Sequence, residues 1–100
     1  GHTQCGAVSG SCGGAELGNL TQLLDKIHPA VEAVKKQKDG AALNCKDGDT
    51  VNEIAKVNVM NVIKSIQEQS PIVAEQIKNG EVKIVGAMHD LRTGKVTFIE

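Results

Sequence analysis

The residues best suited to chemistry lie at the start of the chain, where His2 and Cys5 have the spacing H-x-x-C. An imidazole nitrogen and a thiolate sulfur three residues apart can reach one ion from a tight turn, and both are common ligands of Zn²⁺. The spacing alone arises often by chance. Taken by itself, the pair is more simply interpreted as a polar loop histidine beside a small buried cysteine.

The two other cysteines, Cys12 and Cys45, leave several roles open. An odd total of three cysteines argues against a closed disulfide framework, and the chain lacks the cysteine density of a small secreted scaffold. One Cys12–Cys45 bridge with Cys5 left free is an alternative, but unpaired cysteines are the preferred interpretation. Cys12 is also a candidate third metal ligand, whereas Cys45, in a polar stretch, is expected to take no part in the site.

The elements that position this pair must lie downstream, and the first is an amphipathic helix. Residues 1–14 are rich in glycine and are expected to form a loop whose backbone comes close to a neighbouring group. Pro29 should end or kink the following helix near His28 and begin a further turn through Lys38. The apolar residues with helical spacing are Leu17, Leu20, Leu24, Ile27 and Val31.

A second, longer helix is predicted after a polar loop at 38–49. Thr50 and Glu53 have the spacing of a capping box, which would mark its start. The helix should run to about Gln69. Its apolar stripe consists of Val51, Ile54, Ala55, Val59, Val62, Ile63 and Ile66.

The last third of the chain is predicted to hold a short helix and a hairpin. Ser70-Pro71 has the pattern of an N-cap followed by proline at the first helical position, and Asn79-Gly80 should close that helix. Strands are expected at 82–88 and 95–99. The turn between them contains Gly94, which we expect at positive φ, so the two strands should form a hairpin.

The composition limits both the core and the partners. Phe98 is the only aromatic residue among 100, so the core must be aliphatic, and its apolar faces are expected to be completed by further chain or by a partner subunit. The formal net charge is −1, and no basic stripe with interleaved aromatics predicts a nucleic-acid partner. No stretch approaches a membrane span, and no signal peptide is visible at a start that is Gly1 and not methionine.

A resemblance to one enzyme family rests on segments in a fixed order. Residues 1–8, Gly-His-Thr-Gln-Cys-Gly-Ala-Val, are similar to a metal-ligand segment in which a buried strand ends in Gly-His and the cysteine is followed by glycine. Helix and hairpin segments follow in the same order, at 17–20, 27–31, 61–62, 70–73 and 80–96. Together these segments resemble the bacterial β-class carbonic anhydrases over essentially the whole chain.

This resemblance implies a fold class and an activity. The fold it implies is α/β, here the C-terminal part of a parallel sheet with flanking helices and a terminal β-hairpin. The implied enzyme forms close homodimers or higher oligomers. Its activity is the reversible hydration of CO2 to bicarbonate and a proton, a lyase reaction in which a Zn²⁺ cofactor makes a bound water acidic enough to supply hydroxide near neutral pH.

Residue by residue, the resemblance assigns His2 and Cys5 as zinc ligands. It gives Gly6 the position whose backbone N–H faces the substrate. It also makes Cys12 a small residue in the loop after the site, and it favours a structural hydrogen-bonding role for His89, where many relatives have tyrosine.

The chain departs from the family pattern in the rest of the active site. The family's Cys-x-Asp-x-Arg segment, which supplies another zinc cysteine and an Asp-Arg pair, occurs nowhere in residues 1–100. We therefore interpret 1–100 as the C-terminal portion of a single domain that is catalytically incompetent alone, because two ligands cannot close a tetrahedral site. A non-catalytic pseudo-enzyme or interaction module of the same fold is the alternative, and a zinc enzyme for another small linear molecule is a third. Related bacterial enzymes occur in cytoplasm and periplasm, so the compartment stays open.

Overall fold

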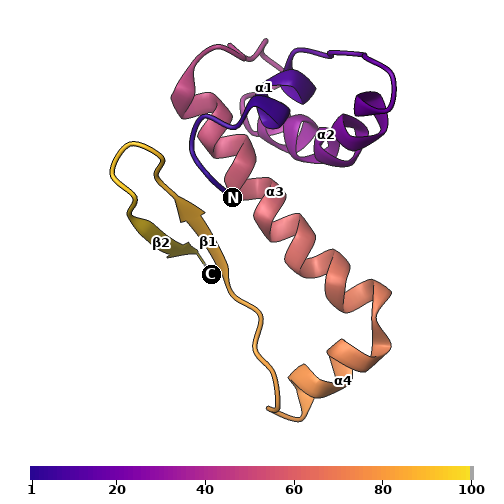
Figure 1. Ribbon diagram of the computed structural model, residues 1–100. Helices are drawn as coiled ribbons and strands as arrows, with labels where there is room; N and C mark the ends of the chain where they lie inside the picture. The colour runs from indigo at the N-terminus through magenta and orange to yellow at the C-terminus, as the bar shows by residue number, and fades with distance from the viewer. Residues whose placement is uncertain (100) are drawn as a thin grey trace.

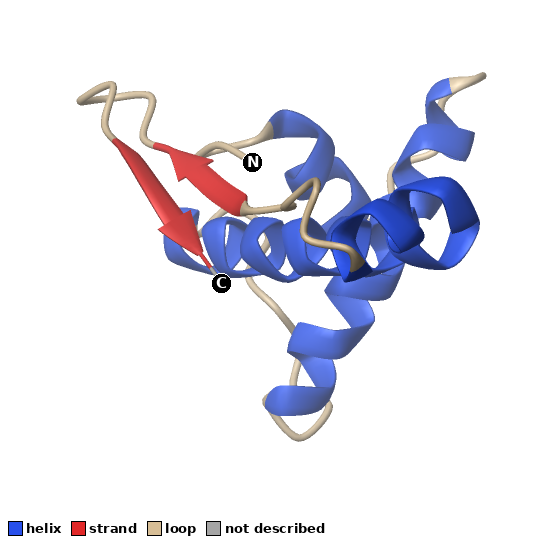
Figure 2. Cartoon of the chain, turned by 90° about the horizontal axis from the view of Figure 1, so that it is seen from below, coloured by secondary structure: helices blue, strands red, loops and turns tan. Residues whose placement is uncertain are grey.

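The computed structural model describes residues 1–99, in which helices precede a small antiparallel sheet. The α3 helix forms the axis of the chain, with α1 and α2 at one end, α4 at the other, and the hairpin alongside (Figure 1). Seen from below, the hairpin lies to one side of the helices (Figure 2). The helices are α1 (Gly6–Cys12), α2 (Leu20–Gln37), α3 (Gly48–Gln69) and α4 (Pro71–Lys78), and the strands are β1 (Gly86–His89) and β2 (Val96–Ile99).

The α1 helix replaces part of the loop predicted for residues 1–14, so that prediction was wrong for 6–12. Tertiary contacts explain the difference. Val8 and Ser11 are both buried, and the Ser11 hydroxyl donates a hydrogen bond to the carbonyl of Leu24 at 2.9 Å. The loop was predicted from the glycine content of this segment. The tertiary contacts of α1 offset the low helix propensity of Gly6 and Gly10.

A disulfide joins Cys12, the last residue of α1, to Cys45 in the loop before α3. The preference for unpaired cysteines was therefore wrong, and the alternative of a single Cys12–Cys45 bridge with Cys5 free is the one observed. The bond also removes Cys12 from the candidate metal ligands. Beside it, the Ser9 hydroxyl donates to the Cys45 carbonyl at 2.8 Å, so α1 and this loop are attached at two points.

Pro29 was predicted to end or kink the helix near His28 and to begin a further turn through Lys38. The α2 helix continues through Pro29 to Gln37, so it does not end near His28. A proline inside a helix removes one hydrogen bond and costs about 3 kcal/mol. The buried residues beyond it explain why the helix persists, because full burial of each valine contributes about 1.5–3 kcal/mol. The residues that continue the buried face after the proline are Ala30, Val31 and Val34.

The start of α3 differs from its prediction, and its end agrees. The helix begins at Gly48, and its N-cap residue is Asp47, three residues before the predicted N-cap Thr50. Thr50 does not cap the helix, since its hydroxyl donates to the Asp47 carboxylate at 2.9 Å. The end at Gln69 is as predicted.

The α4 helix has both predicted boundaries. The Ser70 hydroxyl accepts a hydrogen bond from the Val73 N–H at 3.3 Å, which is N-cap geometry. Asn79 is the C-cap residue, and Gly80 follows it at φ 76°. This is the left-handed conformation expected after a helix.

The predicted hairpin is confirmed, with a shorter first strand. β1 and β2 pair antiparallel with Gly86 opposite Ile99, and Gly94 has φ 78° in the turn. β1 begins at Gly86, so 82–85, predicted as strand, lie outside it. The described residues form a mixed helical and antiparallel structure compatible with α/β. Their one parallel pairing is an isolated bridge between His2 and His89, so the predicted parallel sheet is not seen in this part of the chain.

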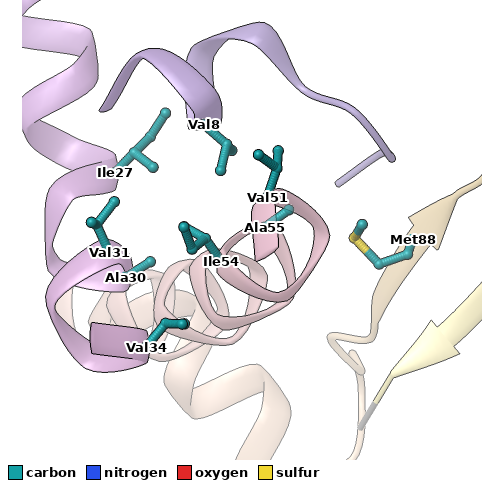
Figure 3. Packing of buried hydrophobic residues seen from close by; sticks show 9 residues of the cluster. All are labelled: Val8, Ile27, Ala30, Val31, Val34, Val51, Ile54, Ala55 and Met88. Carbon is teal, nitrogen blue, oxygen red and sulfur yellow. The ribbon is translucent and has the colours of Figure 1, made fainter. Parts of the chain in front are cut away.

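The core is aliphatic and lies mainly between α2 and α3, with contributions from α1 and β1 (Figure 3). Its buried members are Val8, Ile27, Ala30, Val31, Val34, Val51, Ile54, Ala55 and Met88. Ile54, on α3, and Val34, on α2, are the largest fully buried side chains. Within residues 1–99, none of the helices is long and apolar enough to cross a membrane.

Candidate metal centre

The segment that carries His2 runs beside β1. The amino group of Gly1 donates to the Ala87 carbonyl at 3.0 Å, and the His89 N–H donates to the Gly1 carbonyl at 2.9 Å. The Thr3 N–H then donates to the His89 carbonyl at 2.9 Å. Residues 1–3 therefore lie as a parallel neighbour of β1, and the chain turns away from the strand after Thr3.

The His2 ring is half-buried, and its Nδ1 lies 2.8 Å from the Thr3 carbonyl oxygen. A carbonyl oxygen can only accept a hydrogen bond, so Nδ1 must carry the proton in this contact. The lone pair of the neutral ring is then on Nε2. A fixed tautomer with a backbone partner on the other nitrogen is the usual state of a metal-binding histidine.

Cys5 occupies the N-cap position of α1 without capping the helix through its side chain. Its carbonyl accepts the Ser9 N–H at 3.0 Å, so the backbone of Cys5 is fixed by the first turn of the helix. The sulfur is partly exposed and forms no disulfide, and among residues 1–99 it is the remaining free thiol. The two other cysteines are consumed by their bond to each other.

His2 and Cys5 both line a groove of about 510 Å³ between α3 and the segment leading into β1. Most of the wall is apolar, and its valine and isoleucine side chains are Val8, Ile27, Val59, Val62, Ile63, Ile66, Ile84 and Val85. The structure thus brings the two predicted ligands to one surface. Gly6 opens α1 beside Cys5, but it is exposed and does not line the groove.

The donor set fits zinc as half of a site. An imidazole nitrogen and a thiolate sulfur are ligands typical of Zn²⁺, which takes four in tetrahedral geometry. Within residues 1–99, no three His, Cys, Asp or Glu side chains are grouped so that they could hold a metal ion. His89 is near the pair through its backbone, while its side chain is exposed.

Sequence reasoning missed Asn52, the α3 residue that contacts this turn. Gln4, between the two predicted ligands, has φ 52°, and its N–H donates to the Asn52 side-chain oxygen at 2.9 Å. The two residues are 48 positions apart. No local pattern predicts such a contact.

A histidine with a free Nε2 and an unpaired cysteine therefore lie beside an apolar groove on a mixed helical and β framework. Residues 1–96 match a family model described as carbonic anhydrase. The chain belongs to the carbonic anhydrase family, which confirms the resemblance noted from its sequence and supports CO2 hydration, a lyase reaction, as its general type of function. Comparisons with curated proteins and with solved structures found no match.

Proposed function

We propose that the complete protein containing this chain catalyses the zinc-dependent, reversible hydration of CO2 to bicarbonate and a proton. The observation that carries the proposal is the turn at residues 2–5. It presents a histidine with a free Nε2 and the free thiol of Cys5 at one groove, in a chain that matches the family over residues 1–96.

In this proposal, His2 Nε2 and Cys5 Sγ hold the zinc ion. When bound, zinc supplies the Lewis acidity that activates water near neutral pH. The hydrogen bond from His2 Nδ1 to the Thr3 carbonyl keeps the ring in the tautomer that leaves Nε2 available. The apolar groove side chains suit a small nonpolar substrate. The Gly6 N–H, in the first turn of α1 where backbone donors lack helical acceptors, is proposed to face the substrate.

The remaining active-site groups are proposed to come from a segment upstream in the same domain. Residues 1–100 would then be the C-terminal portion of that domain, and a Cys-x-Asp-x-Arg segment would supply a further zinc cysteine and the Asp-Arg pair. The chain alone would be inactive, because two donors do not complete a tetrahedral site. We also propose that the complete protein is a homodimer or a higher oligomer.

Replacement of the thiol tests the zinc assignment. Cys5→Ser in the complete protein should reduce bound zinc from about one ion per chain to near zero, because a neutral hydroxyl is a far weaker ligand than a thiolate. Metal content is measured by inductively coupled plasma mass spectrometry, with CO2 hydration measured in parallel. His28→Ala, which removes an exposed histidine that does not line the groove, is the matched control and should keep its zinc. Unchanged zinc in Cys5→Ser would show that this residue is not a ligand.

The alternative function is a non-catalytic interaction module of the same fold. It is favoured by the small number of donors, since only two of the ligands that zinc needs are brought together in residues 1–99. Intact mass and N-terminal sequencing of the natural protein separate the two. An upstream Cys-x-Asp-x-Arg with bound zinc supports the enzyme, and a protein with neither supports the module.

A further inference from the structure

The backbone between the two proposed ligands has an unfavourable conformation. Gln4 has φ 52°, in the left-handed region that residues other than glycine rarely adopt. Its conformation fixes the relative directions of His2 and Cys5, because it lies between them, directly before the N-cap residue Cys5. Such a conformation persists only where the surrounding structure holds it in place.

Two elements hold this turn from opposite sides. On the hairpin side, the Thr3 N–H donates to the His89 carbonyl at 2.9 Å, and the Thr3 hydroxyl accepts the Leu91 N–H at 3.0 Å. On the helix side, the Asn52 Oδ1 accepts the Gln4 N–H at 2.9 Å. The Asn52 contact is the one that acts directly on the left-handed residue.

Asn52 is itself well anchored. It lies in the first part of α3 between Val51 and the fully buried Ile54, both members of the core. Its own position is therefore set by core packing and not by the turn it contacts. Gln4, by contrast, is exposed, so its N–H can find water as a substitute acceptor. Loss of the hydrogen bond should release the turn without opening the core.

We propose that Asn52 is a positioning residue for the zinc half-site, which holds the left-handed turn at Gln4 so that His2 and Cys5 are directed at one ion. This inference rests on the proposed function, since it assumes that the pair binds zinc. Within residues 1–99, Asn52 hydrogen-bonds to neither proposed ligand, so it acts through the Gln4 backbone. Its replacement should therefore weaken zinc binding without abolishing it.

The test measures zinc affinity of the complete protein by competition with a chromophoric chelator. Asn52→Ala should raise the zinc dissociation constant about tenfold, the lower end of the range for residues that orient metal ligands. Asn52→Asp keeps an oxygen acceptor at the same place and should stay within about threefold of the unmodified protein, since the lost contact is restored. Asn61→Ala, an exposed position further along α3, is the matched control and should have no effect.

A second variant separates positioning from general destabilisation. Gln4→Gly in the Asn52→Ala background should recover several-fold of the lost affinity, because glycine adopts positive φ without the penalty that glutamine incurs. A purely structural role for Asn52 predicts no such recovery. The visible spectrum of the Co²⁺-substituted protein gives an independent readout, which should change in Asn52→Ala and return toward that of the unmodified protein in Asn52→Asp.

The outcomes distinguish this inference from the proposed function. If the unmodified protein binds no zinc, both are overturned. If it binds zinc and Asn52→Ala binds it equally well, only the role of Asn52 is overturned. The same conclusion holds if the glycine substitution recovers no affinity.

Discussion

At the scale of single residues, Gly86 illustrates how closely the hairpin approaches α3. A Cβ added at this position would lie 2.7 Å from Val59 Cγ1, closer than Cβ atoms approach other atoms in proteins, and 3.0 Å from Ile63 Cδ1, which is tighter than most such contacts. Gly86 is also the first residue of β1, which carries the backbone groups that hold residues 1–3. The absence of a side chain here therefore sets the distance between the proposed ligand segment and the long helix.

Gly86→Ala should destabilise the complete protein by about 1–3 kcal/mol, the usual cost of overpacking a tight contact. The measurement is thermal or urea unfolding. Gly48→Ala is the matched control, because nothing lies within 4 Å of the added methyl at that helix start. Its stability should be unchanged or slightly higher. Equal stability of the two variants would contradict the close approach.

Gly94 is required for a different reason. It has φ 78° and open space around it, and its N–H donates to the Asp90 carbonyl at 2.8 Å. Gly94→Val should cost about 1–3 kcal/mol, because a β-branched residue is strained in this conformation. Gly94→Asn should be much milder, since asparagine tolerates positive φ. A melting temperature unaffected by valine would count against the turn geometry.

The positions that sequence predicted correctly at this scale are those whose cause is local. Gly94 in its turn and Ser70 capping α4 depend on neighbours within a few residues. The conformation of Gln4 and its contact with Asn52 depend on where α3 passes the turn. That information is contained in the tertiary fold and in no short segment. The same holds for the grouping of His2 and Cys5 on one groove, which the structure supplies and the H-x-x-C spacing alone could not.

At the scale of elements, α1 is held by connections to its neighbours. It has only seven residues, too few to be stable as an isolated helix. The Cys12–Cys45 disulfide ties its end to the loop before α3, and the Ser11 hydroxyl ties it to α2. Because Cys5 is the residue from which α1 starts, this small helix also determines where the proposed ligand lies.

Reduction of the disulfide should lower the stability of the protein by about 3–4 kcal/mol, as expected from chain entropy for a closed loop of this length. The bridged cysteines are 33 positions apart. Melting temperatures with and without dithiothreitol give the measurement, and Cys12→Ser/Cys45→Ser is the control that should be insensitive to the reductant. Thiol titration of the unfolded chain should find one reactive cysteine in residues 1–100 before reduction and three after it. Three thiols before reduction would contradict the bridge.

The helices show why element boundaries were predicted unevenly. The end of α3 and both ends of α4 agree with the sequence, because Ser70-Pro71 and Asn79-Gly80 are strong local signals. For α2 the sequence left either an end or a kink at Pro29, and the helix does not end there, because burial of Val31 and Val34 outweighs the local preference of proline. In α2, where the local preference of proline conflicts with burial of the residues that follow, burial determines that the helix continues.

At the scale of the whole molecule, the apolar stripe of α3 is only half covered. Ile54 and Ala55 are buried under α1 and α2, whereas Val62 is 48% exposed and Ile66 is 40% exposed. The exposed half of the stripe faces the groove that also holds His2 and Cys5. An uncovered apolar wall next to the proposed ligands is the surface on which the proposed upstream segment of the domain would pack. Exposed patches of this kind otherwise favour association between molecules.

A protein limited to residues 1–100 should therefore fail to behave as a stable monomer. Size-exclusion chromatography with light scattering should show self-association, and thermal unfolding should lack a cooperative transition. Ile66→Lys places a charge in the groove and should reduce the association, because a charged side chain is costly to bury in an apolar contact. Leu17→Lys, 72% exposed and not among the residues that line the groove, is the matched control and should leave it unchanged. A monomer that melts cooperatively would contradict the proposal that further chain completes this domain, and it would favour the stand-alone interaction module.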